Sequence, residues 1–312
     1  MNAIEMKGLT KFYGRSRGIL GLDLTVSEGE FFGFIGPNGA GKSTTIRTLL
    51  GLIKGSKGSA SIFGKDIVKE KTSILSQVGY MPSEAVFYPG MRVKEVIRLS
   101  AGLRKASYGQ EADRLCRRLG LDVSKKVDEL SFGNRKKVSI VCALQHDPRL
   151  CILDEPTSGL DPLMQREFFA ILKERNAKGT TIFLSSHVLS EIQRNCTRAA
   201  IIREGKLIAC DSVEALSKTS AKRVHVQGDV SLSALNDVRD VQRNESGISF
   251  LYGGDIKALL QVLADQEIND LAISEPDLEE IFLHYYLENT GEGDISGSKG
   301  SGRKDLDGGE ER

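Results

Sequence analysis

The chain has 312 residues, which is enough for one large domain or two domains of ordinary size. Charged residues make up 27% of it, the formal net charge is +1, and no block of lysine and arginine is long enough to follow a phosphate backbone, so the charge does not indicate a nucleic-acid partner. The segment after Met1 is polar and no apolar run reaches the roughly 18 to 20 residues that cross a bilayer, so we expect no signal peptide and no membrane span, and any membrane role through a partner.

Residues 1–222 alternate short apolar runs with helical patterns, which predicts an α/β domain with a largely parallel sheet. The strand-like segments are almost continuously apolar, as expected of strands covered on both faces. The clearest of them are 30–36, 150–155 and 180–187.

From residue 223 the predicted elements become shorter, which indicates a small C-terminal α+β domain over 223–290. Residues 291–312 are rich in glycine, serine and charge, so we expect a disordered tail there. The C-terminal elements that we expect are strands at 223–228, 247–252 and 270–276, and helices at 255–266 and 277–289.

The cysteines are odd in number, form no CxxC pair and lie mostly in apolar segments, so we interpret them as buried thiols of a reducing cytosol. The histidines show no metal-ligand spacing. The five cysteines are Cys116, Cys142, Cys151, Cys196 and Cys210.

The segment GPNGAGKST at 36–44 fits the pattern G-x-x-x-x-G-K-[ST] and stands between a strand-like run and a helical pattern. Gly39 and Gly41 allow the backbone to turn so that successive N–H groups point at phosphate oxygens. We expect Lys42 to reach the β- and γ-phosphates and the Ser43 hydroxyl to bind Mg²⁺. The nucleotide-binding residues predicted here are Gly36, Pro37, Asn38, Gly39, Ala40, Gly41, Lys42, Ser43 and Thr44.

Two adjacent carboxylates, Asp154 and Glu155, end the apolar strand at 150–155. Successive strand residues point to opposite sides, so we expect the two to have different roles. Asp154 is placed to hold Mg²⁺, directly or through water, and Glu155 to act as general base, or to orient the water, for attack on the γ-phosphate. An Asp-Glu-Pro sequence also simply starts turns, and it is the loop at 36–44 that favours the catalytic interpretation.

Two further features are compatible with phosphate chemistry. His187 ends the strand at 180–187, where α/β sheets place ligand contacts, although a histidine there could also serve only to satisfy hydrogen bonds. The loop LSFGN at 130–134 precedes a helical pattern, and Ser131 is a typical capping residue. The dipole of the following helix makes Ser131 and Gly133 an anion site.

These segments in this order, together with SGLD at 158–161, resemble the nucleotide-binding subunit of ABC transporters across residues 1 to about 220. The resemblance implies a P-loop NTPase of the ABC type, with a RecA-like core, an antiparallel β subdomain and a helical subdomain. It implies an ATPase whose cofactors are ATP and Mg²⁺. It also implies a head-to-tail dimer in which each ATP lies between the Walker A loop of one subunit and the LSGGQ-type loop of the other.

The implied partners are a separate transmembrane permease subunit and a second ATP-binding subunit, at the cytoplasmic face of the cell membrane. Two copies of this chain are favoured because the motifs on both of its faces are competent. The resemblance makes Glu155 the catalytic carboxylate and His187 a contact of the γ-phosphate. It gives Tyr13 a place against adenine, whereas the sequence alone equally allows a core aromatic. The residues that it assigns to the paired nucleotide sites are Ser131, Gly133, Asn134 and, as a coupling residue, Asp161.

Three positions depart from the family pattern. Ser83 stands where the family usually has a glutamine, and its neighbour Glu84 would then contact Mg²⁺ or its water. Phe132 and Asn134 replace a glycine and a glutamine of the LSGGQ sequence.

The subclass follows from two shorter resemblances. Segments 87–97 and 274–286 are similar to those of bacterial ATPase subunits that serve multidrug and antibiotic-peptide exporters, so we expect export. The helices near 88–115 are then expected to contact the permease.

Two other functions remain open from the sequence. A non-transport ABC protein of DNA repair would need a long coiled coil between the phosphate loop and the second loop, whereas only residues 44–129 separate them, without heptads. Ribosome-associated members usually carry two such domains in one chain. An ATP-dependent clamp with little turnover is the second alternative, which Ser83 favours and Glu155 and His187 oppose.

Overall fold

The predicted fold class, an α/β domain with a largely parallel sheet and a smaller α+β part at the C-terminal end, is confirmed by the computed structural model. The structure describes residues 1–14, 16–104, 109–217, 222–228, 230–244, 247–264 and 266–274. The helix expected at 277–289 and the tail expected at 291–312 lie outside the described residues.

The central sheet has six strands in the order β10-β9-β3-β8-β7-β6. Its five strands from β9 to β6 run parallel, and β10 pairs antiparallel at the edge. Every residue of β3, β7 and β8 is buried, as their continuous apolar runs predicted. The strands are β3 Phe31–Ile35, β6 Val78–Met81, β7 Leu150–Asp154, β8 Thr181–Ser186, β9 Arg198–Arg203 and β10 Lys206–Ser212.

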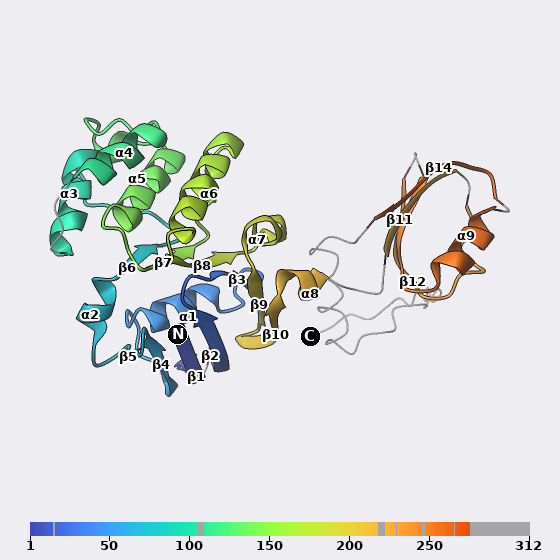
Figure 1. Cartoon of the computed structure of the whole chain (residues 1–312), viewed down its shortest axis with the longest axis horizontal. Coiled ribbons are helices and arrows are strands. Elements are labelled where there is room, and N and C mark those ends of the chain that lie inside the picture. The colour runs from blue at the N-terminus through green and yellow to red at the C-terminus, as the bar shows by residue number, and fades with distance from the viewer. Residues whose placement is uncertain are drawn as a thin grey trace, which may run out of the picture.

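Helices cover both faces of this sheet (Figure 1). Alternate strand residues enter two separate cores, with Leu153 and Leu184 on the side of α3 to α7, and Ile152 and Phe183 on the side of α1 and α2. The helices are α1 Lys42–Leu49, α2 Lys71–Leu75, α3 Val93–Leu103, α4 Gln110–Arg118, α5 Phe132–Leu144, α6 Pro162–Asn176 and α7 Leu189–Asn195, with a 3₁₀ turn at Val127–Glu129.

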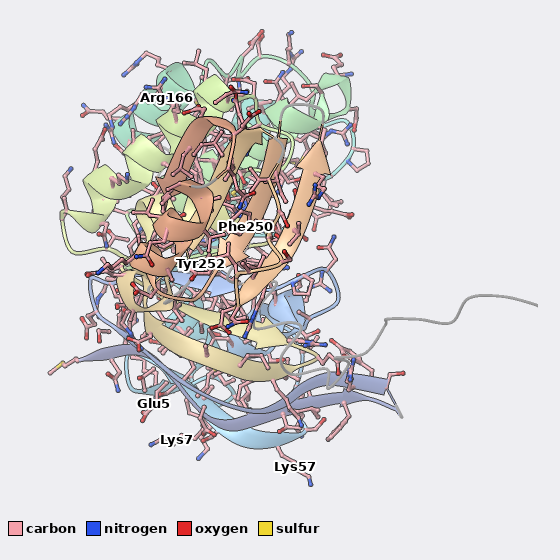
Figure 2. All side chains as sticks on the ribbon, turned by 90° about the vertical axis from the view of Figure 1, so that its right-hand side faces the viewer. Glu5, Lys7, Lys57, Arg166, Phe250 and Tyr252 are labelled. Carbon is pink, nitrogen blue, oxygen red and sulfur yellow. The ribbon has the colours of Figure 1, made fainter. Side chains whose placement is uncertain are left out.

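A second sheet, in the order β2-β1-β4-β5, is antiparallel and packs on α1. Its other face is charged, and Figure 2 shows Glu5, Lys7 and Lys57 projecting from it. The ion pair between Lys7 Nζ and Glu5 Oε1 spans 2.9 Å. The strands are β1 Asn2–Tyr13, β2 Ser16–Ser27, β4 Lys57–Ile62 and β5 Lys65–Asp66.

The C-terminal part forms a third sheet, in the order β12-β13-β11-β14, with a core of its own. Phe250 and Tyr252 (Figure 2) pack there with Leu259 and Leu263 of α9. The strand β12 was not predicted from the sequence. After α8 Val213–Ser217, the elements are β11 Lys222–Gly228, β12 Val238–Asn244, β13 Gly247–Tyr252, α9 Ile256–Ala264 and β14 Ile268–Ser274.

One expectation about the cysteines is wrong. Cys116, Cys151 and Cys196 are buried and Cys142 is half-buried, but Cys210 is exposed. Cys210 lies on β10, which has a strand partner on one side only, so the edge of the sheet leaves its side chain at the surface. Within the described part of the chain, no helix has the length and apolar character to cross a membrane.

Candidate functional site

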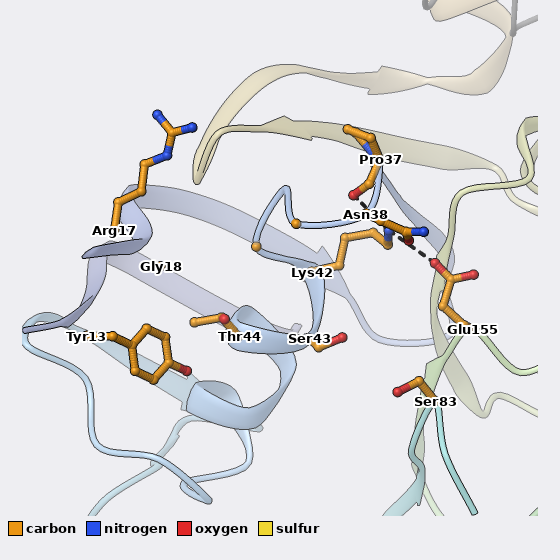
Figure 3. A pocket seen from close by; sticks show the side chains of 12 residues that line it. Tyr13, Arg17, Gly18, Pro37, Asn38, Lys42, Ser43, Thr44, Ser83 and Glu155 are labelled. Atoms are coloured by element: carbon orange, nitrogen blue, oxygen red, sulfur yellow. Dashed lines mark hydrogen bonds and ion pairs between the residues drawn. The ribbon is translucent and has the colours of Figure 1, made fainter.

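The predicted residues of the 36–44 loop, the acid pair and His187 meet at the carboxyl ends of β3, β7 and β8, next to the end of β6, and these strands are neighbours in the central sheet. They surround a cavity of about 280 Å³ (Figure 3). The residues that line it are Tyr13, Arg17, Gly18, Pro37, Asn38, Gly39, Gly41, Lys42, Ser43, Thr44, Ser83 and Glu155.

The loop after β3 has the backbone conformation that its glycines predicted. Gly39 and Gly41 have φ values of 80° and 111°, in the left-handed region that side chains disfavour. The N–H of Ala40 donates to the carbonyl of Pro37 at 3.1 Å, which closes a tight turn. Helix α1 then starts at Lys42, so its first N–H groups have no helical acceptor and face an anion site with the positive end of the helix dipole.

Lys42 extends along this loop and reaches the catalytic carboxylate predicted at Glu155 (Figure 3). Its Nζ donates to the carbonyl of Gly36 at 2.6 Å and to that of Pro37 at 3.2 Å, and lies 3.1 Å from Glu155 Oε1. The side chain is 6% exposed. A fixed ammonium in this position attracts the phosphate groups of a nucleotide.

Asp154 is the last residue of β7 and is fully buried. Its Oδ1 accepts a hydrogen bond from Ser185 Oγ at 3.1 Å. Its Oδ2 is buried and, within the described part of the chain, has no hydrogen-bond partner. A buried carboxylate oxygen without a hydrogen-bond partner is suited to binding a cation.

Glu155 leaves the strand, so the alternation expected for strand residues does not continue through it. Its φ is 49°, and its N–H donates to the carbonyl of Ser185 at 3.0 Å. This left-handed conformation turns the side chain into the cavity, where Oε1 contacts Lys42 and Oε2 lies 2.6 Å from His187 Nδ1. The carboxylate therefore lies between a lysine and a histidine.

His187 is the first residue after β8, and half of its side chain is exposed. It borders a second cavity of about 420 Å³, next to the first, which Ser83, Glu84 and Glu155 also line. Ser83 thus lies at both cavities, and Glu84 lies at the second.

Tyr13 ends β1 and is 47% exposed, so it is not a core aromatic. Its ring lines the cavity around Lys42 (Figure 3). Arg17 and Gly18, which lie across the β1–β2 turn from Tyr13, line the cavity too and were missed from the sequence. The short turn after Tyr13 was the available signal, because a hairpin there places the start of β2 beside the end of β1.

The loop at 130–134 caps α5 as predicted: Ser131 Oγ accepts a hydrogen bond from the N–H of Asn134 at 3.3 Å. Asp161 likewise caps α6, accepting from the N–H of Met164 at 2.9 Å. Among the described residues around Lys42, the cavity lining includes neither of them, nor Gly133. These residues therefore do not line the cavity around Lys42, although Phe132 of the same loop lines the second cavity with Glu155 and His187.

Known proteins resemble this chain in both sequence and structure. A family model described as "ABC transporter" matches residues 19–158. The bacitracin transport ATP-binding protein BcrA of Bacillus licheniformis is 36% identical over 296 residues, which is 90% of this chain and 96% of that protein. The linearmycin resistance ATP-binding protein LnrL of Bacillus subtilis (strain 168) is 30% identical over 303 residues, with coverage of 90% and 97%.

A solved structure of an ATP-binding subunit of an ABC transporter is also similar, with a TM-score of 0.65 and 33% identity over 69% of this chain and 91% of that one. The matched region contains the loop around Lys42 and the acid pair at the end of β7. The chain therefore belongs to the ABC transporter family, as an ATP-binding and ATP-hydrolysing protein.

Proposed function

We propose that the chain is the ATPase subunit of an exporter and acts through a separate transmembrane permease at the cytoplasmic face of the cell membrane. The observation that carries the proposal is the contact of Glu155 with both Lys42 and His187 at the mouth of the cavity. The relatives named for bacitracin transport and linearmycin resistance support export as the direction.

In this proposal the loop around Lys42 binds the triphosphate of ATP and Tyr13 stacks on adenine. Lys42, with its ammonium held by two carbonyls, binds the β- and γ-phosphates. Glu155 accepts a proton from the attacking water, and His187, hydrogen-bonded to the same carboxylate, orients that water and contacts the γ-phosphate.

Mg²⁺ fits the donors that the chain supplies. Asp154 Oδ2, which has no hydrogen-bond partner among the described residues, and the hydroxyl of Ser43 are hard oxygen ligands, which Mg²⁺ prefers. Bound there, the ion would neutralise charge on the phosphates. A site built by protein alone is not expected, because Mg²⁺ usually takes its other ligands from water and phosphate.

We propose that two copies of the chain form the working ATPase. The residues Ser131, Gly133, Asn134 and Asp161 then act at the nucleotide held by the other copy, which accounts for their absence from the described lining of the cavity around Lys42. In the domain division that we propose, residues 1–222 bind ATP and 223–290 form a second domain.

The permease is proposed to dock on an apolar groove formed by α3 and the segment before it. This groove of about 560 Å³ is lined by residues of the segment 85–89, of α3 and of α5. Three of the side chains that line it are strongly exposed: Val86 by 82%, Tyr88 by 71% and Leu103 by 77%. A contiguous apolar surface of this kind is typical of a site that binds another protein.

The variant Glu155→Gln tests the function. It keeps the shape of the side chain but removes its capacity to accept a proton, so we expect ATP to bind with a change of less than about threefold, while turnover falls by about 10²-fold or more. The trapped ATP should also hold two copies together. Fluorescent-ATP titration, phosphate release and size-exclusion chromatography with ATP measure these three quantities.

The alternative of a clamp with little turnover makes a different prediction. In that case the wild type and Glu155→Gln would release phosphate at the same slow rate. An ATP-loaded variant that remains monomeric would contradict the two-copy arrangement while leaving the role of Glu155 intact.

A further inference from the structure

Lys136 is a fully buried lysine in the first turns of α5. A buried ammonium costs several kcal/mol unless hydrogen bonds and opposite charges compensate it. The helix also contains Lys137, only half-buried, directly after it. The position of Lys136 therefore requires a specific compensating environment.

That environment is the acid pair. Lys136 Nζ donates a hydrogen bond to the backbone carbonyl of Glu155 at 3.0 Å. The negative charges of Asp154, Glu155 and Glu84 raise the pKa of Lys136, against the larger lowering caused by burial. The ring of Phe132, one turn earlier in α5, lies 5.9 Å from Nζ at its centroid.

The carbonyl that Lys136 binds belongs to the strained residue of the site. Glu155 has a φ of 49°, a conformation that costs on the order of 1 kcal/mol or more for a residue with a side chain. Such a conformation persists only where the surroundings hold it. The peptide before Glu155 is held by its N–H bond to Ser185, and the peptide after it by Lys136.

We propose that Lys136 is a positioning residue for Glu155: by holding the carbonyl of Glu155, it keeps the carboxylate aimed between Lys42 and His187. The inference rests on the proposed role of Glu155 as the base. Helix α5 would then contribute to two nucleotide sites. The loop that caps it would contact the nucleotide bound by the other copy, and its buried Lys136 would hold the base of its own site in place.

The test is Lys136→Met, which has nearly the same length but neither charge nor donor. We expect kcat to fall by about 10- to 100-fold, the range expected when one charge-assisted hydrogen bond is removed. The Kd for fluorescent ATP should change by less than about threefold, because Lys136 is absent from the described lining of the cavity around Lys42. The matched control, Lys137→Met, should retain the wild-type kcat.

A second comparison separates positioning from a loss of folding. In a Glu155→Gln background, Lys136→Met should cause no further fall in the residual rate, because the group that it positions has been removed. Lys136→Gln, which keeps a shorter N–H donor, should have a kcat between those of Lys136→Met and the wild type, and serves for the same measurements if Lys136→Met does not fold.

The outcomes are distinct. An unchanged kcat in a folded Lys136 variant, or a fall in the Glu155→Gln background equal to that in the wild type, would overturn the inference while the proposed function stands. A Glu155→Gln protein with the wild-type rate would overturn the proposed function itself.

Discussion

His146, two residues after α5, is a half-buried polar residue with one buried ring nitrogen that lacks a hydrogen-bond partner in the described part of the chain. Its Nε2 lies 3.3 Å from the carbonyl of Val78, and its Nδ1 is buried with no partner in the described part of the chain. Burial, aided by the positive charge of Arg104, lowers the pKa of His146 from 6.5 to about 4. In the folded protein this ring therefore stays neutral at pH values where it is protonated in the unfolded chain.

The pH dependence of stability follows from that difference. Between pH 6.5 and 4 the unfolded chain binds the proton and the folded chain does not, so the contribution of His146 is full above pH 6.5 and is lost as the pH falls. We expect His146→Gln to lose less unfolding free energy than the wild type between pH 7 and 5. Urea unfolding at both pH values measures this, and equal losses would mean that another group causes the slope.

For single residues, the sequence was sufficient to predict those whose chemistry is recognisable from a motif or from their place at the end of a strand. Lys42, Glu155 and His187 were predicted from motif and strand position, and the structure brings them within contact distance. Lys136 was not predictable, because a lysine in a helical pattern is usually exposed and only the packing of α5 against the end of β7 buries it.

At the scale of helices and loops, the start of α5 packs closely against the loop before α6 because Gly159 in that loop has no side chain. Gly159 has a φ of 79°, and a Cβ placed on it would lie 2.2 Å from the ring of Phe132. The aromatic ring thus occupies space that any other residue at 159 would fill. The absence of a side chain at Gly159 therefore explains how the structure accommodates the ring of Phe132 at the start of α5.

Gly159→Ala should therefore disturb both loops. We expect it to lower the unfolding free energy by about 1 to 3 kcal/mol, from the clash and from the disfavoured φ. Phe132→Ala in the same chain should recover the part due to the clash and leave the part due to φ. A double-mutant cycle from chemical denaturation gives the coupling, and additive effects would show that the ring does not press on residue 159.

Among the helices and strands, the sequence predicted those with a clear pattern of apolar residues. The strands at the centre of the sheet were visible because burial on both faces makes them continuously apolar. β12 was missed because its sequence, VRDVQRN, is mostly polar and its pairing with β13 is what defines it.

For the molecule as a whole, the proposed docking of a permease on the apolar groove around α3 would place the chain at the membrane. Leu103 ends α3 and is 77% exposed, so a charged residue is tolerated there without loss of folding. We expect Leu103→Glu to move the chain from the membrane fraction to the supernatant while its own ATPase rate stays unchanged. Val68→Glu, at another exposed apolar position, is the control, and membrane retention of the Leu103 variant would place the docking surface elsewhere.

Ser131 and Gly133 are absent from the described lining of the cavity around Lys42, and this has a consequence for the symmetry of the proposed pair. In the proposed pair, each copy both offers a capped helix end and needs one, so a two-fold rotation would satisfy both copies at once. Such an arrangement is closed, because each 130–134 loop lies at a nucleotide site of the other copy and no loop or site is left over. The association would therefore stop at two copies instead of growing into a filament.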